Sequence, residues 1–192
     1  AHHFKYVILE PHQAQRVKRI DDDNWTDVTD GSIDPTQPYR YYSANGDGKF
    51  IDIFFFDGPI SKAVSFDTLV NDAQIYADHL ETIKHQKRKH VRMVHIATDG
   101  ETYGHHKKFG DRSLAYLLKI EAPRRGWTIA NYGEFLSEHP SNWEVKIKSG
   151  EGGLGTSWSC PHGVKRWADH CGCRGDGPAH WTQEWRRPLR ES

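Results

Sequence analysis

Short apolar runs separated by longer amphipathic stretches constrain the fold of this chain more than any other feature. Three runs, at residues 6–9, 51–56 and 91–97, are rich in β-branched or aromatic residues and are too short and too apolar for surface helices. Residues 127–130 are a fourth, less apolar candidate. Strands that alternate with helices favour βα units over an all-β sandwich, so the sequence predicts an α/β fold with parallel strands.

Three helices are expected between and after these strands. Apolar residues recur every three or four positions across residues 65–84, which predicts one long amphipathic helix. A second helix is expected to begin at a cap on Asp111 and to end before Pro123, and a third to cover residues 132–138. The stretch 21–48 is rich in Asp, Pro, Gly and Asn and is expected to be a long loop.

The composition changes near residue 149, after a region that holds all the predicted helices and strands. A glycine-rich link, 149–155, leads into a tail that contains all three cysteines and four of the seven tryptophans. We therefore divide the chain into a region 1–148 and a Trp- and Cys-rich tail, 149–192, which we expect to pack on it.

The charge balance argues against several classes of partner. With 26 basic and 26 acidic side chains the formal net charge is zero, so no overall field attracts nucleic acid or an anionic membrane. The basic cluster 85–90 suits a helix C-terminus better than a nucleic-acid patch. No apolar run approaches a membrane span of about 20 residues, and no signal peptide is evident. Three cysteines are too few for a disulfide framework, which favours the reducing cytoplasm.

Acidic residues follow each of the three firm strand candidates. Glu10 and Asp57 come directly after the first two, and Asp99 follows the third after Thr98; the carboxyl ends of parallel strands meet on one face of a sheet. Asp57 serves equally well as a helix cap. Asp99 has more ionisable neighbours, because Glu101 and a pair of histidines, residues 105 and 106, follow within a tight turn. Such a cluster suits glycosidic cleavage by two differently tuned carboxyls, or alternatively a divalent metal.

The tail offers a separate set of metal ligands. Cys160, His162, Cys171 and Cys173 make up three thiolates and one imidazole, which suits a structural tetrahedral zinc ion. His170 is a substitute ligand. The alternatives are three free thiols, one disulfide with a thiol left over, or an iron–sulfur cluster.

One segment resembles a known enzyme motif. Asp99-Gly100-Glu101-Thr102-Tyr103-Gly104 is similar to the Asp-Gly-Glu-x-aromatic-Gly motif of glycoside hydrolase family 57, which contains α-amylases, amylopullulanases, 4-α-glucanotransferases and branching enzymes. More narrowly, the chain resembles a bacterial subgroup of amylase or mannosidase homologues with a domain of unknown function. The other segments that carry this resemblance follow in the family's order: 6–14, 51–61, 131–136 and 157–163.

The resemblance implies a fold and a set of roles. Family 57 enzymes are built on an incomplete barrel of seven parallel strands and react with retention, so region 1–148 would be part of a (β/α)7-type barrel and its catalytic region. Asp99 would be the general acid/base, and the nucleophilic glutamate would lie upstream of this chain. The expected substrate-binding residues are His12, Gln13, Asp57, Glu101, His105, His106 and Trp158, the last by stacking on sugar rings.

The leading hypothesis is therefore a retaining glycosidase or glucan transferase acting on α-linked glucans. Its substrate would be an oligo- or polysaccharide, and the reaction would need no organic cofactor. Its protein partner would be the missing N-terminal part of the barrel or a second subunit. One alternative is a non-catalytic glucan-binding or regulatory fragment. Another is a metal-dependent hydrolase resembling polysaccharide deacetylases, with Asp99 and either His105 or His106 as ligands.

Overall fold

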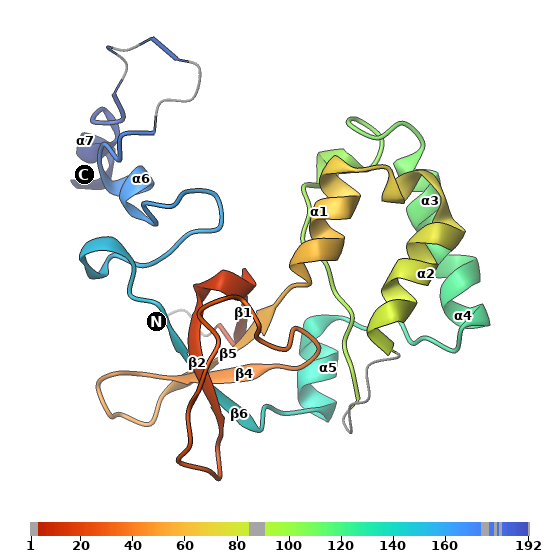
Figure 1. Ribbon diagram of the computed structural model, residues 1–192, viewed down its shortest axis with the longest axis horizontal. Coiled ribbons are helices and arrows are strands. Elements are labelled where there is room, and N and C mark those ends of the chain that lie inside the picture. Colours follow the sequence, from red (N-terminus) through yellow and green to blue (C-terminus); the bar gives the residue numbers. More distant parts are fainter. Residues whose placement is uncertain (1–3, 85–90, 174–176, 179, 181, 192) are drawn as a thin grey trace.

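The computed structural model describes residues 4–84, 91–173, 177–178, 180 and 182–191. These residues form one mixed sheet of six strands in the order β1-β5-β4-β6-β2-β3 (Figure 1). The strands are β1 (Tyr6–Leu9), β2 (Ala14–Arg19), β3 (Thr26–Asp27), β4 (Tyr39–Tyr42), β5 (Phe50–Phe55) and β6 (Trp143–Ile147). The chain is thus a mixed α/β protein, and the two strands predicted nearest the N-terminus are confirmed as β1 and β5.

The sheet is parallel only in part. β1 pairs in parallel with β5, with Ile8 opposite Phe54, and β4 meets β6 in parallel at a single residue pair. The β4–β5, β2–β6 and β2–β3 pairs are antiparallel. The expectation of parallel strands throughout is therefore wrong for this sheet. β4 and β5 are joined by a short turn, and a short turn allows only antiparallel neighbours.

Two predicted strands are absent from the described residues. Residues 91–97 run extended beside the end of β5 but bond irregularly: Met93 N donates to Thr36 O (3.0 Å), Asp57 N donates to His95 O (3.1 Å) and Ala97 N donates to the Ser61 hydroxyl (3.0 Å). Residues 127–130 are also irregular. The backbone of 91–97 bonds to loops and a side chain, and Trp127 N donates to Ala122 O of the helix Ala122–Arg124 (2.9 Å), so apolar composition alone produces no strand in either segment.

The helices and turns lie mostly between β5 and β6. The α-helices are α1 (Gly58–Phe66), α2 (Ala73–Lys84), α3 (Gly110–Tyr116), α4 (Ala122–Arg124), α5 (Tyr132–Glu138), α6 (Lys165–Ala168) and α7 (Arg186–Glu191). The remaining turns are η1 (Pro11–Gln13), η2 (Leu69–Asn71), η3 (Gly100–Thr102), η5 (Glu151–Gly153) and a π-helical turn, η4 (Leu117–Glu121). The prediction for α5 is confirmed, with Asn131 as its N-cap.

The helix predicted across residues 65–84 is two helices. α1 ends at Phe66, and the Lys107 ammonium donates to the free carbonyl of Asp67 (2.7 Å) just beyond it. α2 begins after Asp72, whose carboxylate accepts the backbone N–H groups of Gln74 (2.8 Å) and Ile75 (3.0 Å). The apolar spacing continues across the break, but α1 ends at its C-cap, Asp67, and Asp72 caps the start of α2 after the turn η2.

The helix predicted from Asp111 also differs at both ends. It begins at Gly110, preceded by Phe109 in the left-handed region (φ 64°), so Asp111 lies in the first turn and is not the cap. It continues past Pro123, since the π-helical turn η4 leads directly into α4. Proline excludes the ordinary hydrogen bond to the fourth residue before it, and the wider turn precedes that position.

The stretch 21–48 contains β3 and β4 and is not a simple loop. Its aspartates are used in turns, because each of five carboxylates accepts the backbone N–H two residues later. These five residues are Asp22, Asp27, Asp30, Asp34 and Asp47. The acidic composition of this segment therefore has a local structural use.

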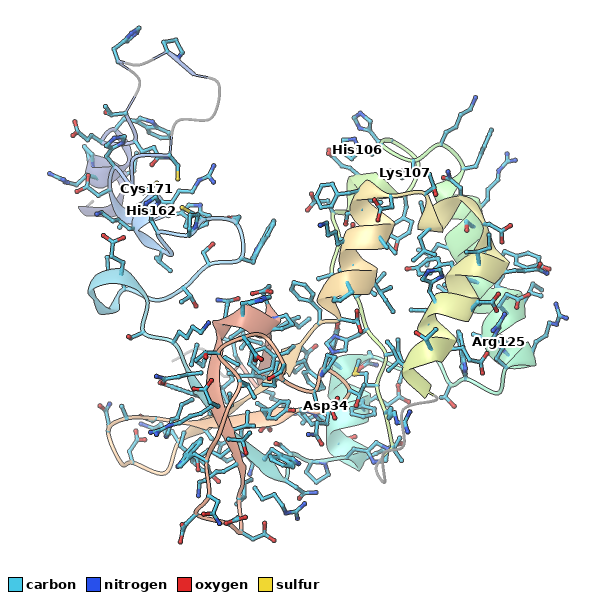
Figure 2. The ribbon with its side chains drawn as sticks, in the orientation of Figure 1. Asp34, His106, Lys107, Arg125, His162 and Cys171 are labelled. Carbon is cyan, nitrogen blue, oxygen red and sulfur yellow. The ribbon has the colours of Figure 1, made fainter. Side chains whose placement is uncertain are left out.

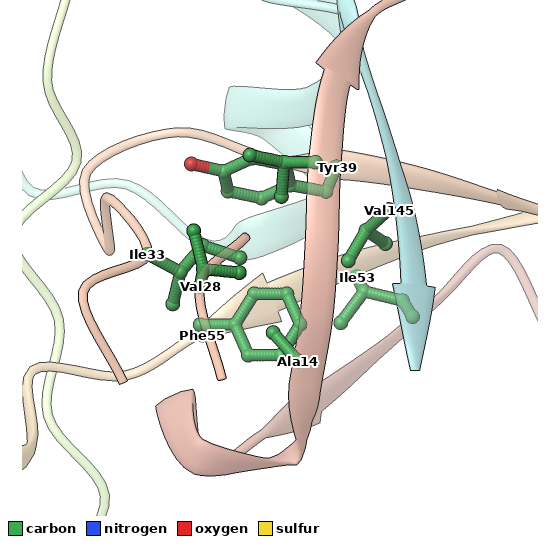
Figure 3. Packing of buried hydrophobic residues seen from close by; sticks show 8 residues of the cluster. Ala14, Val28, Ile33, Tyr39, Ile53, Phe55 and Val145 are labelled. Carbon is green, nitrogen blue, oxygen red and sulfur yellow. The ribbon is translucent and has the colours of Figure 1, made fainter. Parts of the chain in front are cut away.

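Two hydrophobic cores hold the chain together. The first lies on one face of the sheet and contains Ala14, Val17, Val28, Ile33, Tyr39, Ile53, Phe55 and Val145 (Figure 3). On the other face, Phe54 makes edge contacts with Tyr132 and Phe135 of α5. The second core joins α1, α2 and η4 through Ile60, Val64, Leu69, Val70, Tyr76, Ala77, Ile83 and Leu117.

The tail and the helices α1 to α4 lie at opposite ends of the molecule (Figure 1). At the helical end, Arg125 ties α4 to α2 through bonds to Asp78 (2.6 Å) and Glu81 (2.6 Å), and it also bonds Glu121 (3.2 Å) (Figure 2). None of the described helices has the length and apolar character of a membrane span.

Candidate functional site

Asp99 occupies an exposed turn at the end of the extended segment 91–98. It is the N-cap residue of η3, and its carbonyl accepts the N–H of Thr102 (3.0 Å). Its carboxylate makes no capping hydrogen bond. The backbone therefore holds this residue in place while its side chain stays open to a ligand.

Buried and half-buried hydroxyl groups hold the inner side of this turn. The Thr98 hydroxyl lies 2.7 Å from that of Ser65 on α1 and 2.9 Å from that of the buried Thr102. The Tyr103 hydroxyl lies 3.2 Å from that of Tyr76, and burial raises the pKa of Tyr103. Both tyrosines are therefore neutral hydrogen-bonding groups, and the Asp99 turn is fixed to α1 and α2.

Glu101, His105 and His106 gather on the outer side of the same turn. The Glu101 carbonyl accepts the N–H groups of His105 (3.2 Å) and His106 (3.0 Å), and its carboxylate lies 3.4 Å from His106 Nε2. The two imidazoles stack with their centroids 4.8 Å apart, and all three residues are exposed. Figure 2 shows His106 at the surface beside Lys107. Among the described residues, these histidines and Asp99 do not form a metal-ligand group.

Asp57 has a structural role at the other end of α1. Its carboxylate accepts the N–H of Ile60 (2.9 Å) as the N-cap, and burial raises its pKa. Thr98 bonds to Ser65, in the last turn of α1, and eight residues of helix separate Ser65 from Asp57. Eight residues rise about 12 Å. The structure therefore does not bring Asp57 and Asp99 to the separation of about 5–5.5 Å that retaining glycosidases use.

Glu10, His12 and Gln13 form a compact group after β1. The Glu10 carboxylate accepts the N–H of His12 (2.9 Å) and lies 2.7 Å from His12 Nδ1. Gln13 accepts the N–H of Glu10 (3.0 Å) and donates to the carbonyl and hydroxyl oxygens of Thr156 (both 3.2 Å). The His12 ring lies against Gly31, which has φ 85° and no space for a side chain.

A pocket of about 320 Å³ lies beside the Gln13–Thr156 contact, between this group and the tail. Glu10, His12 and Gln13 line one side, and Ser157, Cys160 and Pro161 are among the residues of the other. Trp158 is 72% exposed and does not line it. Asp57 and Asp99 also lie outside its lining, so the predicted binding residues fall into separate groups along the molecule.

The four predicted metal ligands converge. The ligand atoms of Cys160, His162, Cys171 and Cys173 all lie within 4.8 Å of one another, and Cys160 and Cys171 are buried. Figure 2 shows His162 and Cys171 together in the tail. His170 is engaged elsewhere, since its Nδ1 accepts the N–H of Gln183 (3.3 Å).

Comparison with known families adds the deciding observation: the model of glycosyl hydrolase family 57 matches residues 2–148. The chain belongs to glycosyl hydrolase family 57. Membership implies a glycoside hydrolase or transferase of the kind that acts on α-glucans, with a carbohydrate as substrate. A search of curated proteins found no match. The family 57 match contains the Asp99 turn, Asp57 and the group after β1, whereas the Cys/His cluster lies beyond it.

The family 57 region also contains a histidine that the sequence reasoning missed. His95 is buried, with Nε2 3.0 Å from Pro35 O and Nδ1 3.0 Å from the Tyr132 hydroxyl. A carbonyl only accepts, so Nε2 carries the proton and Nδ1 accepts from the tyrosine. Burial lowers its pKa to about 4. The available signal was a lone histidine inside the apolar run 91–97.

Proposed function

We propose that this family 57 protein is a retaining glycosidase or glucan transferase for α-linked glucans, with Asp99 as general acid/base. The observation that carries the proposal is the exposed Asp99 carboxylate on a turn that hydroxyl–hydroxyl bonds of Ser65, Thr98 and the buried Thr102 hold in place. A group that donates a proton to a glycosidic oxygen must reach the substrate while its backbone stays fixed.

In this mechanism Asp99 acts twice. It first gives its proton to the leaving glycosidic oxygen, and it then takes a proton from the incoming water or sugar hydroxyl. Glu101, His105 and His106 flank it on the exposed side of the turn and bind substrate hydroxyls. Trp158, exposed in the tail, offers an aromatic face to a sugar ring, and Trp158, His12 and Gln13 act at subsites away from the Asp99 turn (Figure 1).

The nucleophile comes from outside the present chain. Asp57 caps α1 at the end opposite to the Ser65–Thr98 contact, about 12 Å away along the helix, and is therefore not the nucleophile. Residues 1–148 form part of an incomplete barrel, with the tail 149–192 packed on it, and the upstream part of the barrel or a second subunit supplies the glutamate. The three free thiols suit a cytoplasmic location.

The test measures cleavage and transfer on two α-glucosidic substrates by the chain together with the upstream part or second subunit that supplies the glutamate. One is a maltooligosaccharide, and the other is an aryl α-maltoside whose acidic phenol leaves without protonation. Asp99→Asn should lower kcat/KM on the maltooligosaccharide about 10²- to 10⁴-fold. The first step on the aryl substrate should be affected much less, because that leaving group needs no acid.

Asp23→Asn is the matched control, since this exposed aspartate lies in the turn between β2 and β3. It should leave both rates unchanged. Equal losses on both substrates would argue against a general acid, and full activity of Asp99→Asn would exclude the role altogether.

A second candidate is a glucan-binding module without catalysis. It is favoured by the distance between Asp57 and Asp99, which leaves the acid/base without that partner. The same assay separates the two: binding of maltooligosaccharides by wild type and Asp99→Asn, with turnover by neither, would support the binding module.

A further inference from the structure

We propose that Cys160, His162, Cys171 and Cys173 bind one structural Zn²⁺ ion, and that this centre fixes the segment 156–163 against the end of β1. The site lies outside the family 57 match and is independent of the proposed glycosidase activity. Its residues come from two short stretches of the tail, 160–162 and 171–173.

The distances fit the edges of a tetrahedron around one ion. With Zn–S about 2.3 Å and Zn–N about 2.0 Å, the edges of the tetrahedron are about 3.8 Å between sulfurs and about 3.5 Å between sulfur and nitrogen. The Cys160 sulfur lies 3.9 Å from that of Cys171 and 3.8 Å from that of Cys173. His162 Nδ1 lies 3.8 Å from the Cys160 sulfur and 3.3 Å from the Cys173 sulfur.

The backbone is shaped to present these ligands. Gly163 N donates to Cys160 O (2.9 Å) and closes the turn that carries His162, with Gly163 at φ 62°. Gly172 has φ 87°, which turns the chain so that Cys171 and Cys173 approach the same point. At both glycines the backbone has a positive φ angle, which residues other than glycine rarely adopt.

Gln183 supplies the outer support that metal ligands require. Its Oε1 accepts the backbone N–H of Cys171 (3.2 Å), and its Nε2 donates to the backbone carbonyl of Cys173 (3.3 Å). One side chain thus orients two of the four ligands from a residue outside the cluster.

The geometry disfavours the other uses of these thiols. A disulfide needs two sulfurs about 2.05 Å apart, and Cys160 is nearly equidistant from its two partners at almost twice that distance. An iron–sulfur cluster holds several metal ions between its cysteines and would spread them farther than one tetrahedral edge. Three thiolates and one imidazole whose ligand atoms all lie within 4.8 Å of one another are the ligand set of a structural zinc site.

The centre determines how the tail meets the rest of the chain. Val164 N donates to Gly155 O (3.2 Å), and Gly155 N donates to Ser149 O (2.7 Å), so residues 149–164 form a closed loop. Thr156 in this loop accepts both bonds from Gln13. A metal that anchors Cys160 and His162 therefore also anchors this loop. The loop lines the 320 Å³ pocket on the side opposite Glu10 and His12.

The experiment counts metal on the whole chain by native mass spectrometry after purification without a metal column. We expect one zinc per chain, and a Co²⁺-exchanged sample should show the visible absorption of a tetrahedral thiolate site. Cys171→Ser should carry none, and Gln183→Ala should bind zinc about 10- to 100-fold more weakly. His170→Asn is the matched control and should keep one zinc.

Three outcomes would overturn the proposal. They are a metal-free wild-type chain, a mass two hydrogens lower that reveals a disulfide, and iron with sulfide in place of zinc. The cobalt spectrum needs no variant, so it decides the question even where Cys171→Ser does not fold. Hydrogen exchange tests the second part: chelation should speed exchange at residues 155–164, and unchanged rates there would show that the metal does not hold the loop.

Discussion

The Cys/His cluster and the Asp99 turn use their side chains in opposite ways. In the cluster, two short stretches of sequence turn four ligand atoms toward one point and bury two of the cysteines. At the turn, the backbone and the buried hydroxyls are fixed, while Asp99, Glu101 and the two histidines face outward. A site that closes on itself is complete within a short segment, whereas a site open to a ligand needs its remaining groups from elsewhere.

Removal of the metal should give the largest contrast between the two regions. Structural zinc sites contribute on the order of 10 kcal/mol of binding free energy to folding, so a chelator should unfold the tail locally. Limited proteolysis should then cut within 155–173 and leave 98–110 intact. Simultaneous cleavage of both segments would mean that the tail and the Asp99 turn unfold as one unit.

The second largest effect should be the dependence of folding stability on the protonation of His95, which lies in the segment that leads to Asp99. Its pKa is about 4 in the folded chain against 6.5 for the ordinary side chain. Above pH 6.5 both folded and unfolded chains hold a neutral ring. Between 6.5 and 4 only the unfolded chain takes up the proton, so stability should fall by on the order of 3 kcal/mol as the pH drops through this window.

The measurement is urea unfolding of wild type and His95→Gln from pH 7 to pH 4. The glutamine keeps one donor and one acceptor but does not titrate, so its curve should be flatter by this amount. Parallel curves would exclude His95 as the source of the acid sensitivity. The cysteine tail contributes no difference between the two proteins, which isolates the effect to the segment that leads to Asp99.

Thr102→Val should have a smaller effect at the base of the turn. The substitution removes a buried hydroxyl that bonds to Thr98, at a cost of about 1 kcal/mol in the free energy of unfolding. Thr128→Val, at an exposed position, is the control and should cost nothing measurable. Equal unfolding midpoints for the two variants would show that the hydroxyl network does not stabilise the Asp99 turn.

The smallest effect is expected at Asp99 itself. Asp99→Ala should change the free energy of unfolding by no more than about 0.5 kcal/mol, because the carboxylate is exposed and caps nothing. Asp57→Ala should cost about 1 kcal/mol, since it removes the N-cap of α1. Thermal unfolding of both variants checks the order, and a reversed order would give Asp99 a structural role.

The parts of the fold that were predictable have local causes. β1 and β5 are apolar runs, and α5 has Asn131 as its cap at the predicted boundary. The break between α1 and α2 was missed because the apolar period continues through it, although Asp72 carried the signal. β2 and β6 were missed because they direct charged side chains outward and bury only a few apolar residues.

The candidate sites divide in the same way. The convergence of Cys160, His162, Cys171 and Cys173 was predictable from their spacing and residue types, and their role as metal ligands stays a prediction. The pairing of Glu101 with His106 follows from a turn of six residues. The separation of Asp57 from Asp99 depends on the length of α1 and on the Ser65–Thr98 contact, and no local pattern contains that information.

The engagement of both ring nitrogens of His95 has a spectroscopic consequence. The Nε2 proton is buried and bonded to a carbonyl, so it should exchange slowly with water and give a resolved low-field NMR signal. That resonance lies four residues before Asp99 in the chain. Its shift and lifetime would report, without a label or a variant, whether a bound sugar disturbs the segment that carries the proposed acid.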